Sequence, residues 1–506
     1  MRELLFQLPA AGKMSLQSQI REVLVSAILG GQLPVEDRIP SSRHMARQLG
    51  VSRNTVVLAY QGLIDDGYIV ARERSGYYVN EEILNDRAER PDVEIPLGQT
   101  PPDWTSRFRV HPTDQENIHK PANWQDYPYP FIYGQVDHKL FPIAEWRECN
   151  RQALGKQWIE AWTSDFRDQD DPMLIEQIRT RILPRRGIMA SEEEILVTLG
   201  AQNALYLLAS LLVSPETVVA IEDPGYPDVR NIFKLRTDRV MPIPVDSQGL
   251  MVDTRLTHAD IVFTTPSHHF PTTVTMPRER RQMLLDTARS HDLVIVEDDY
   301  EFETNYIGDP YPALKSMDSD GRVIYVGSLS KTLFPGLRMG FLVGPKELIK
   351  ELRALRRLMV RHAPNNNQRA VALFLSLGYH DALIARLGRA YKERWEEMRD
   401  ALARHLPDSS RQPTFGGSSY WVTGPKGLDS DSLAMEAREA GLIIEPGRIY
   451  FSKNTGPSRH FRLGFSSIDS AMIAPGIKLL SGLIDVHMSK KLLRQNSHAG
   501  MHWSNE

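Results

Sequence analysis

A single lysine follows a short apolar run in the stretch Gly327–Gly340, together with two serines and one arginine. The run before it, Val323–Val326, has the composition of a buried strand. Burial disfavours the charged form of a lysine, and the neutral amine is a nucleophile toward carbonyl groups. Hydroxyls and an arginine beside it can hold a phosphate. This combination suits pyridoxal 5′-phosphate (PLP) held as a Schiff base on Lys331. A solvated Ser/Lys/Arg loop is the alternative for this stretch alone.

Length and composition limit the class of protein. The 506 residues suffice for two or three domains with sizeable cores, and a net charge of -4 means that any nucleic-acid binding must come from a local surface. The single Cys149 excludes an intramolecular disulfide framework and a cysteine-rich metal site. We find no apolar run that approaches a length of about 18 residues, which argues against a membrane span. We also find no long apolar segment after Met1, which argues against secretion. We therefore expect a cytoplasmic protein.

Residues 1–79 show the pattern of a small DNA-binding module. Leu16–Leu29 has helical apolar spacing and is followed by two glycines. Ser41 or Ser42 is expected to cap a second helix, Arg43–Leu49, and Ser52 a third. Two short helices joined by a tight glycine-containing turn describe a helix-turn-helix.

A hairpin wing is predicted after the third helix. Two short β-type runs, Tyr68–Arg72 and Tyr77–Val79, are joined by a basic turn that suits the minor groove or the DNA backbone. Arg53 and Asn54 in the first turn of the third helix can make bidentate contacts with base edges. A small helical domain without a DNA function is the alternative.

Residues 80–130 mix charged residues with many prolines and show no sustained periodicity, so we expect a Pro-rich, semi-extended linker. Trp104, Trp124, Tyr127 and Tyr129 suggest that its end near residue 130 docks on the next domain, and a flexible tether is the alternative. Residues 489–506 are expected to form a disordered tail.

Between residues 131 and 488, amphipathic segments alternate with short apolar runs, which predicts a largely parallel sheet covered by helices. In such sheets, ligands bind at the C-terminal ends of the strands, and the candidate residues fall there. The runs are Ile195–Thr198, Val218–Ile221, Ile261–Thr264, Leu293–Glu297, Val323–Val326 and Phe341–Val343.

Residues that suit a PLP site follow several of these runs. Leu199 begins a segment that opens a helix, whose free N–H groups can bind a phosphate. Tyr226 stands in a Pro-Gly-Tyr-Pro turn and can stack on a flat ring. Asp298 can keep a pyridine nitrogen protonated, and Tyr300 can bond the ring hydroxyl. Arg462, inside a later β-type run, needs an anionic partner such as a substrate carboxylate.

Each of these features alone has an ordinary structural explanation, and their order along the chain is what favours a cofactor site. His268 and His269 lack an evident third ligand, so no metal site is expected.

Two stretches resemble known families. Pro40–Arg43, Leu49–Val56 and Arg74–Val79 resemble the winged helix of GntR-type bacterial transcription factors. That resemblance implies DNA contacts by Arg43, Ser52, Arg53, Asn54, Thr55, Arg74, Ser75 and Gly76. The ordered motifs of residues 131–488 resemble fold-type-I PLP-dependent aminotransferases, which implies an α/β domain joined by the long linker to a mostly helical winged helix-turn-helix domain with a β-wing.

The whole chain resembles the MocR/GabR family of PLP-dependent regulators through Glu297–Tyr300, Ser328–Thr332 and Pro335–Arg338. The resemblance implies that Lys331 is the Schiff-base lysine and that Arg462 binds the effector carboxylate. The other cofactor-binding residues it implies are Asp298, Tyr300, Tyr226, Ser328, Ser330, Arg338, Ala201 and Gln202.

Some positions depart from the family pattern. Asp165–Leu174 lacks the tyrosine and glycines usual before the first large-domain helix, and His269 and Thr273 replace the usual Gln and Gly. Asp228 places a negative charge where some members have a basic group, so an effector with a second amino group is a reasonable hypothesis.

The resemblance therefore leads us to expect a homodimeric regulator of a double-stranded DNA operator, which senses an amine or amino acid by forming an external aldimine in place of the bond to Lys331. Two alternatives stay open. One is a true aminotransferase with an attached DNA-binding module, and the other is a sensor of PLP itself that controls vitamin B6 supply.

Overall fold

The computed structural model describes Leu8 and residues 14–35, 38–84, 102–163, 169–308, 311–410, 416–452 and 458–500, with the side chains of 493–500 excepted. The chain divides into two compact units, 1–107 and 108–506. Residues 85–101 of the expected linker, 165–168 of the departing segment and 501–506 of the expected tail lie outside the described residues.

The first unit contains the predicted helices. These are α1 (Leu16–Leu29), α2 (Ser42–Leu49) and α3 (Arg53–Asp65). The hydroxyl of Ser41 accepts a hydrogen bond from the backbone N–H of His44, which makes Ser41 the N-cap of α2. The same arrangement recurs at the start of α3, where the Ser52 hydroxyl accepts from the N–H of Thr55. Gly50 ends α2 with a φ of 65°, the left-handed conformation that glycine adopts without strain.

The wing forms as an antiparallel hairpin of β2 (Ile69–Arg72) and β3 (Gly76–Val79). A third strand, β1 (Arg38–Ile39), pairs with β3 and was not predicted. The sequence signal was weak because only two residues of β1 join the ladder.

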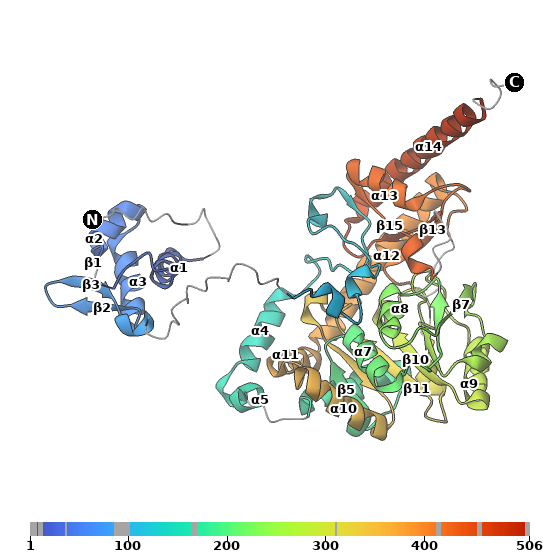
Figure 1. Ribbon diagram of the computed structural model, residues 1–506, viewed down its shortest axis with the longest axis horizontal. Coiled ribbons are helices and arrows are strands. Elements are labelled where there is room, and N and C mark those ends of the chain that lie inside the picture. Colours follow the sequence, from blue (N-terminus) through green and yellow to red (C-terminus); the bar gives the residue numbers. More distant parts are fainter. Residues whose placement is uncertain are drawn as a thin grey trace. The chain divides into compact units, whose positions relative to one another are not determined.

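The second unit is built on an eight-stranded sheet of order β5-β12-β11-β10-β9-β6-β7-β8 (Figure 1). The prediction of a largely parallel sheet is confirmed for β6, β7, β9, β10 and β11, whereas β12 runs antiparallel to both neighbours and β8 antiparallel to β7. The strands are β5 (Ile195–Thr198), β6 (Val219–Asp223), β7 (Val240–Asp246), β8 (Gly249–Leu250), β9 (Ile261–Thr264), β10 (Val294–Asp299), β11 (Val323–Ser328) and β12 (Gly340–Val343).

Helices cover both faces of this sheet, which explains the continuous apolar runs. In β11, Ile324 and Val326 pack with residues of α7, α8 and α10, while Tyr325 belongs to the core on the opposite face. The helices of the second unit are α4 (Ile143–Ala153), α5 (Ile159–Thr163), α6 (Pro172–Gln177), α7 (Ala201–Leu212), α8 (Pro227–Lys234), α9 (Arg278–His291), α10 (Lys346–Val360), α11 (Asn365–Ser376), α12 (Tyr379–His405), α13 (Ser430–Glu439) and α14 (Ser470–Gly500).

A smaller C-terminal layer completes the unit. Its three-stranded antiparallel sheet has the order β13-β16-β15, with β13 at Ser419–Thr423, β16 at His460–Gly464 and β15 at Glu445–Pro446. A separate parallel pair joins β4 (Tyr129–Pro130) to β14 (Leu442–Ile443), so the start of the domain is tied to its end.

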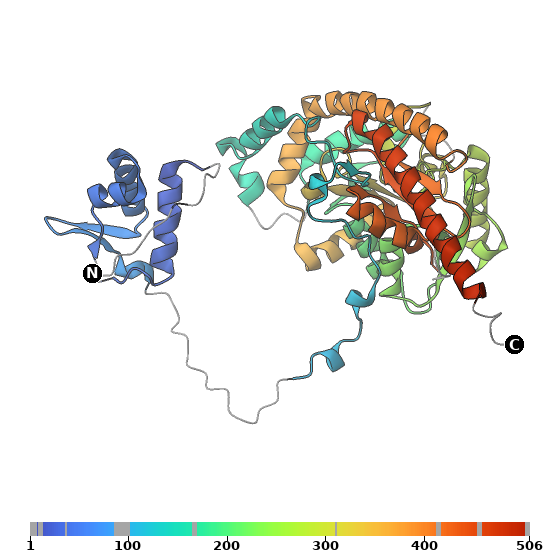
Figure 2. The same cartoon turned by 90° about the horizontal axis from the view of Figure 1, so that it is seen from above.

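The predicted disordered tail is wrong for residues 489–500, because α14 continues to Gly500. The helix α14 lies against α12 (red and orange in Figure 2). Part of it, Ser470–Leu492, is long and apolar enough by composition alone to cross a membrane. Its Ile473, Ile477 and Leu480 are fully buried in the core, as in a packed helix of a globular domain.

The expected linker boundary at residue 130 is also wrong, because the second unit begins at residue 108. Two hydrogen bonds hold this segment on α8: the Gln115 side chain donates to the carbonyl of Asn231, and the Asn231 side chain donates to the carbonyl of Glu116. The end of the expected linker therefore docks on the second unit, as predicted, and is not a flexible tether. The prolines and polar residues of this segment are typical of a linker. Its order comes from tertiary contacts, which the local sequence does not show.

Two glycines allow close packing beside the lysine-bearing strand. A Cβ on Gly340 would lie 2.9 Å from backbone atoms of both Gly200 and Gly327, and a Cβ on Gly327 would collide with the ring of Phe341. The absence of these side chains lets β12 approach β11 and the start of α7. The end of the strand and the helix N-terminus are thereby brought into one site.

Candidate functional sites

A cavity of about 260 Å³ opens at the carboxyl ends of β6, β9, β10 and β11 and is closed by residues from before the sheet. The structure brings most of the predicted cofactor-binding residues into its wall. Those that line it are Ala201, Gln202, Tyr226, Asp298, Tyr300, Ser328, Ser330, Lys331 and Arg338. Residues up to 137 positions apart in the sequence thus meet, because the parallel strands all end at the same edge.

Lys331 follows β11 directly and reaches into this cavity. Its Nζ lies 4.5 Å from the ring centroid of Tyr133. Burial, together with the positive charge of Lys120, lowers the pKa of Lys331 to about 8. A lysine with this pKa is neutral often enough near neutral pH to act as a nucleophile toward an aldehyde.

Asp298 and Tyr300 provide a test of whether PLP fits. The Oδ1 of Asp298 and the hydroxyl of Tyr300 are buried, and neither has a hydrogen-bond partner among the described residues. Buried polar atoms without partners are rare and costly in folded proteins. A pyridine nitrogen and a ring hydroxyl are groups that these two atoms could bind, so the donor set fits the cofactor.

The groups expected around the phosphate lie at the start of α7 and after β11. Ala201 is the first residue of α7, where the backbone N–H groups have no partner within the helix. Arg338 is exposed and its Nη2 donates to the carbonyl of Leu199 over 3.2 Å, so its guanidinium is held beside that helix start. Ser328 ends β11. The Ser330 hydroxyl also exchanges hydrogen bonds with the backbone of Met339, which ties the lysine loop to the chain before β12.

Tyr226 and Asp228 are joined to each other. The Tyr226 hydroxyl donates to Asp228 Oδ2 over 2.9 Å, and the Gln202 side chain donates to the same oxygen over 3.0 Å. Both bonds are made to the same oxygen, so the hypothesis that Asp228 receives a second amino group of an effector stays open.

Arg462 lies on β16 and does not line the cavity. It is completely buried, and its guanidinium carbon lies 3.5 Å from the ring centroid of Tyr133 and 4.2 Å from that of Phe270. Its Nε donates to the hydroxyl of Ser419, while Nη1 and Nη2 have no hydrogen-bond partner among the described residues. These two nitrogens suit an anion, but the two rings separate them from the cavity in this arrangement.

Sequence reasoning missed Lys120 and Tyr133, which both line the cavity. Lys120 comes from the segment taken for a linker, and no local pattern marks it. Tyr133 follows the short strand β4, and its place depends on the pairing of β4 with β14 at the other end of the domain.

We expect Asp298→Asn to stabilise the cofactor-free protein at neutral pH and to weaken PLP binding roughly tenfold or more. Burial, reinforced by Asp299, raises the pKa of Asp298 to about 8 from an ordinary 3.8. The folded state then holds a proton that the unfolded state releases, so this residue lowers stability progressively as the pH rises through that window. Thermal unfolding of the apo-protein near the two ends of the window measures the effect.

The wild type should lose more stability across this pH range than Asp298→Asn. Asp485→Asn, on the exposed side of α14, is the matched control and should behave as the wild type. Equal pH dependence in all three proteins would contradict the buried, protonated Asp298.

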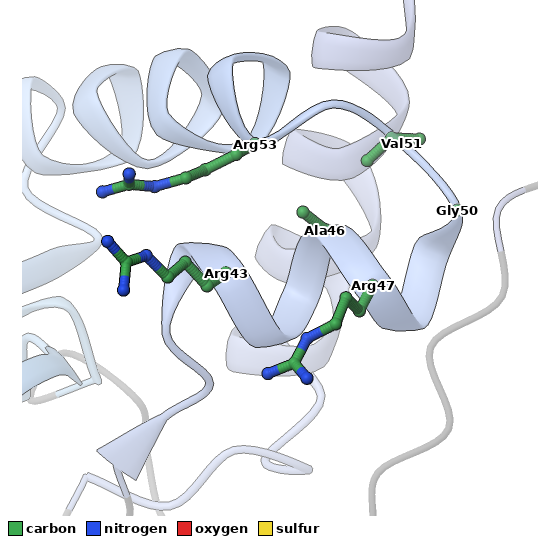
Figure 3. Close-up of a pocket in the computed structure, with 6 residues that line it drawn as sticks. All are labelled: Arg43, Ala46, Arg47, Gly50, Val51 and Arg53. Atoms are coloured by element: carbon green, nitrogen blue, oxygen red, sulfur yellow. The ribbon is translucent and has the colours of Figure 1, made fainter.

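The first unit presents a basic surface at the helix-turn-helix. Arg43 and Arg47 lie on α2 and Arg53 begins α3, and all three are exposed. The side chains of Arg43 and Arg53 extend in the same direction from the two helices (Figure 3). Neither has an ion-pair partner among the described residues, so both guanidinium groups can bind an anionic backbone or base edges. Arg47 shares the hollow between the helices and was not predicted.

The other predicted DNA contacts fall into two groups. Asn54 is exposed at the start of α3, whereas the hydroxyls of Ser52 and Thr55 bond each other over 2.7 Å and help to cap the helix. At the wing, Arg74 has a φ of 60° and is exposed, and the Ser75 hydroxyl bonds that of Tyr78. Gly76 begins β3 beside Arg74.

Comparisons with known proteins agree with this division. Residues 16–79 match the family model of bacterial regulatory proteins of the gntR family, and residues 140–480 match that of aminotransferase class I and II. The HTH-type transcriptional regulator TauR of Rhodobacter capsulatus is 43% identical over 472 residues, which cover 93% of this chain and 97% of that protein. The probable rhizopine catabolism regulatory protein MocR of Rhizobium meliloti is 30% identical, covering 91% of this chain and 92% of that protein.

A solved structure extends the comparison to the second unit. The crystal structure of kynurenine aminotransferase from Pyrococcus horikoshii, in complex with PMP, superposes with a TM-score of 0.69 at 27% identity. The match covers 75% of this chain and 98% of that one. The predicted fold class is thereby confirmed for both units.

Proposed function

Because the chain belongs to the MocR/GabR family of transcriptional regulators, in which a GntR-type winged helix precedes an aminotransferase class I and II domain, we propose that it is a PLP-dependent regulator that senses an amine or amino acid. The single observation that carries this proposal is the half-buried Lys331 in a cavity whose wall also holds the partnerless polar atoms of Asp298 and Tyr300. We further propose that it acts as a cytoplasmic homodimer on a double-stranded DNA operator.

The chain's own residues would hold the cofactor as follows. Asp298 would bind the ring nitrogen, Tyr300 the ring hydroxyl, and Tyr226 the face of the ring. The phosphate would be bound by Ser328, Ser330, Arg338 and the amides of Ala201 and Gln202. When bound, PLP supplies an aldehyde that bonds covalently and reversibly to primary amines.

Sensing would follow from competition for that aldehyde. Without effector, Lys331 would hold the aldehyde covalently. An effector amine would compete with Lys331 for that aldehyde, and the freed Lys331 amine would take up the proton that the effector ammonium loses, inside a cavity that already contains Lys120. The two states therefore differ in charge and in a covalent tether, which provides the differential contacts that a ligand-driven change requires.

Arg462 would bind an effector carboxylate with Nη1 and Nη2 only in an arrangement that uncovers its guanidinium. Tyr133 and Phe270 must first separate from its guanidinium, because their rings cover it. Effector binding would then rearrange side chains that also contact the start of the domain.

The test uses full-length, PLP-loaded protein and a DNA site selected by that protein from random duplexes. Amino acids, diamines and sulfonates are added while cofactor absorbance and DNA affinity are both measured. We expect at least one amino compound to change both. If PLP alone changes DNA affinity and no amino compound has a further effect, the protein senses PLP itself.

A true aminotransferase is a second candidate, which the match to a solved aminotransferase over 98% of its chain favours. Conversion of the cofactor to pyridoxamine phosphate, followed by sustained turnover with a keto acid, would establish this activity and exclude a pure sensor.

A further inference from the structure

Lys120 reaches the cavity from the segment that precedes the α/β domain. Its Nζ donates a hydrogen bond to the carbonyl oxygen of Tyr133 and lies 3.9 Å from Oε1 of Glu445. The side chain is 28% exposed and forms part of the cavity wall. A lysine has three N–H donors, and one of them is used by this carbonyl.

The docked segment sets the position of this lysine. Ile118 packs against the aromatic cluster that includes Tyr133 and Tyr300. Glu116 forms an ion pair with Arg448 over 2.8 Å, and its carbonyl accepts the Asn231 side chain. Lys120 is thus held before any ligand arrives, which reduces the entropy cost of binding one.

The cavity wall holds three cationic side chains, Lys120, Lys331 and Arg338, and two acidic ones, Asp228 and Asp298. A Cβ on Gly134 would lie 3.1 Å from Lys331 Nζ and 3.6 Å from Lys120 Nζ, so the two amines flank the same glycine. Glu445, the nearest acid to Lys120, also accepts the Tyr133 N–H and the Tyr450 hydroxyl. Its charge is therefore shared among several donors.

An acidic group that enters the cavity can reach Lys120 without any rearrangement. Arg462 is shielded by the rings of Tyr133 and Phe270 and does not line the cavity, whereas Lys120 does. Asp228, the residue that could have attracted a second amine, is engaged by Tyr226 and Gln202. The wall thus favours an anion near Lys331 over a second cation.

We propose that Lys120 is a specificity-determining residue that binds the acidic group of the effector. The effector class is then a short amino acid, in which a primary amine replaces Lys331 and a carboxylate or sulfonate pairs with Lys120. This rests on the proposed amine-sensing function. The segment that carries Lys120 is joined along the chain to the DNA-binding unit, so the same contact also gives that segment a direct dependence on the ligand.

The experiment compares wild type with Lys120→Met, Lys120→Gln and Lys120→Arg, all full-length and PLP-loaded. Lys139→Met, an exposed lysine elsewhere in the same unit, is the matched control. The probes share a three-carbon chain: 3-aminopropanoate, 3-aminopropanesulfonate, propylamine and 1,3-diaminopropane. Apparent affinities come from the change in cofactor absorbance, and thermal unfolding checks that each variant is folded.

We expect wild type and Lys139→Met to bind at least one acid-bearing probe roughly tenfold or more tightly than propylamine. Lys120→Met and Lys120→Gln should lose this preference, so that they bind the acid-bearing probes no more tightly than propylamine, and Lys120→Arg should keep it. The two acid probes distinguish a carboxylate from a sulfonate effector.

A second readout needs no effector. The charges that act on Lys331 are those of Lys120, Glu301, Arg462 and Asp298. Removing the charge of Lys120 should therefore move the pH titration of the cofactor absorbance to higher pH, which a merely structural role would not do.

Retention of the acid preference in both neutral variants, or a preference of the wild type for the diamine, would overturn the assignment of Lys120 and leave amine sensing intact. If no probe and no other amine changes the wild-type absorbance, amine sensing itself fails, and this inference fails with it.

Discussion

Replacement of Lys331 by alanine should abolish the absorbance of the lysine-bound cofactor while leaving basal DNA binding measurable. The covalent bond requires a primary amine at this place in the cavity, and alanine provides none. DNA binding should persist because the candidate DNA contacts belong to the first unit, whereas Lys331 belongs to the second.

The measurement combines an absorbance spectrum after PLP loading with a DNA-affinity assay. Lys139→Met should retain the full spectrum. A Lys331→Ala protein with an unchanged band would refute the central assignment. A residual band that disappears only when Lys120 is also replaced would identify Lys120 as a substitute amine, because both amines flank Gly134.

Loss of response to amines should accompany the loss of the band. In this variant, an added amine has no lysine to displace. The change in DNA affinity that the effector causes in the wild type should therefore be lost. A response of equal size in Lys331→Ala would show that sensing does not operate through exchange at this lysine.

Arg53→Ala should weaken binding to a selected DNA site by roughly 1–3 kcal/mol and relax sequence preference. Arg53 is exposed in the first turn of α3, and its side chain extends beside that of Arg43 (Figure 3). A guanidinium at the start of a recognition helix can form two hydrogen bonds with guanine, which alanine cannot replace.

The affinity of each variant is measured on both the selected duplex and random duplexes, because a base contact affects the selected duplex more. Gln61→Ala is the control, because Gln61 is exposed further along the same helix and bonds only Asp65 among the described residues. Arg47→Ala should reduce affinity for all duplexes by a similar factor if Arg47 contacts phosphates. Equal loss on selected and random DNA for Arg53→Ala would assign Arg53 to the backbone instead. The cofactor spectrum should not change in any of these variants.

The sequence alone was sufficient for the DNA-binding unit. Serine caps, apolar spacing and a left-handed glycine act over a few residues, so Ser41, Ser52 and Gly50 determine the helix boundaries locally. The strand β1 was not predicted, because a strand of two residues is too short to show an alternation of apolar and polar side chains.

For the second unit, apolar runs were enough to locate most strands, since strands buried on both faces must be continuously apolar. The helix α14 extends to Gly500, which contradicts the disorder expected for residues 489–500.

The sequence by itself determined which residue types stand at strand ends, and therefore that Asp298, Tyr300 and the serines around Lys331 could share a site. Only the tertiary structure decided the rest of the wall. Lys120 enters because the segment before the domain docks on α8, and no local signal encodes that contact. Arg462 is shielded because the rings of Tyr133 and Phe270 pack against its guanidinium, and their meeting depends on chain segments more than a hundred residues apart. Long-range packing of this kind leaves the motif around Lys331 intact, but it determines which charges an incoming ligand meets.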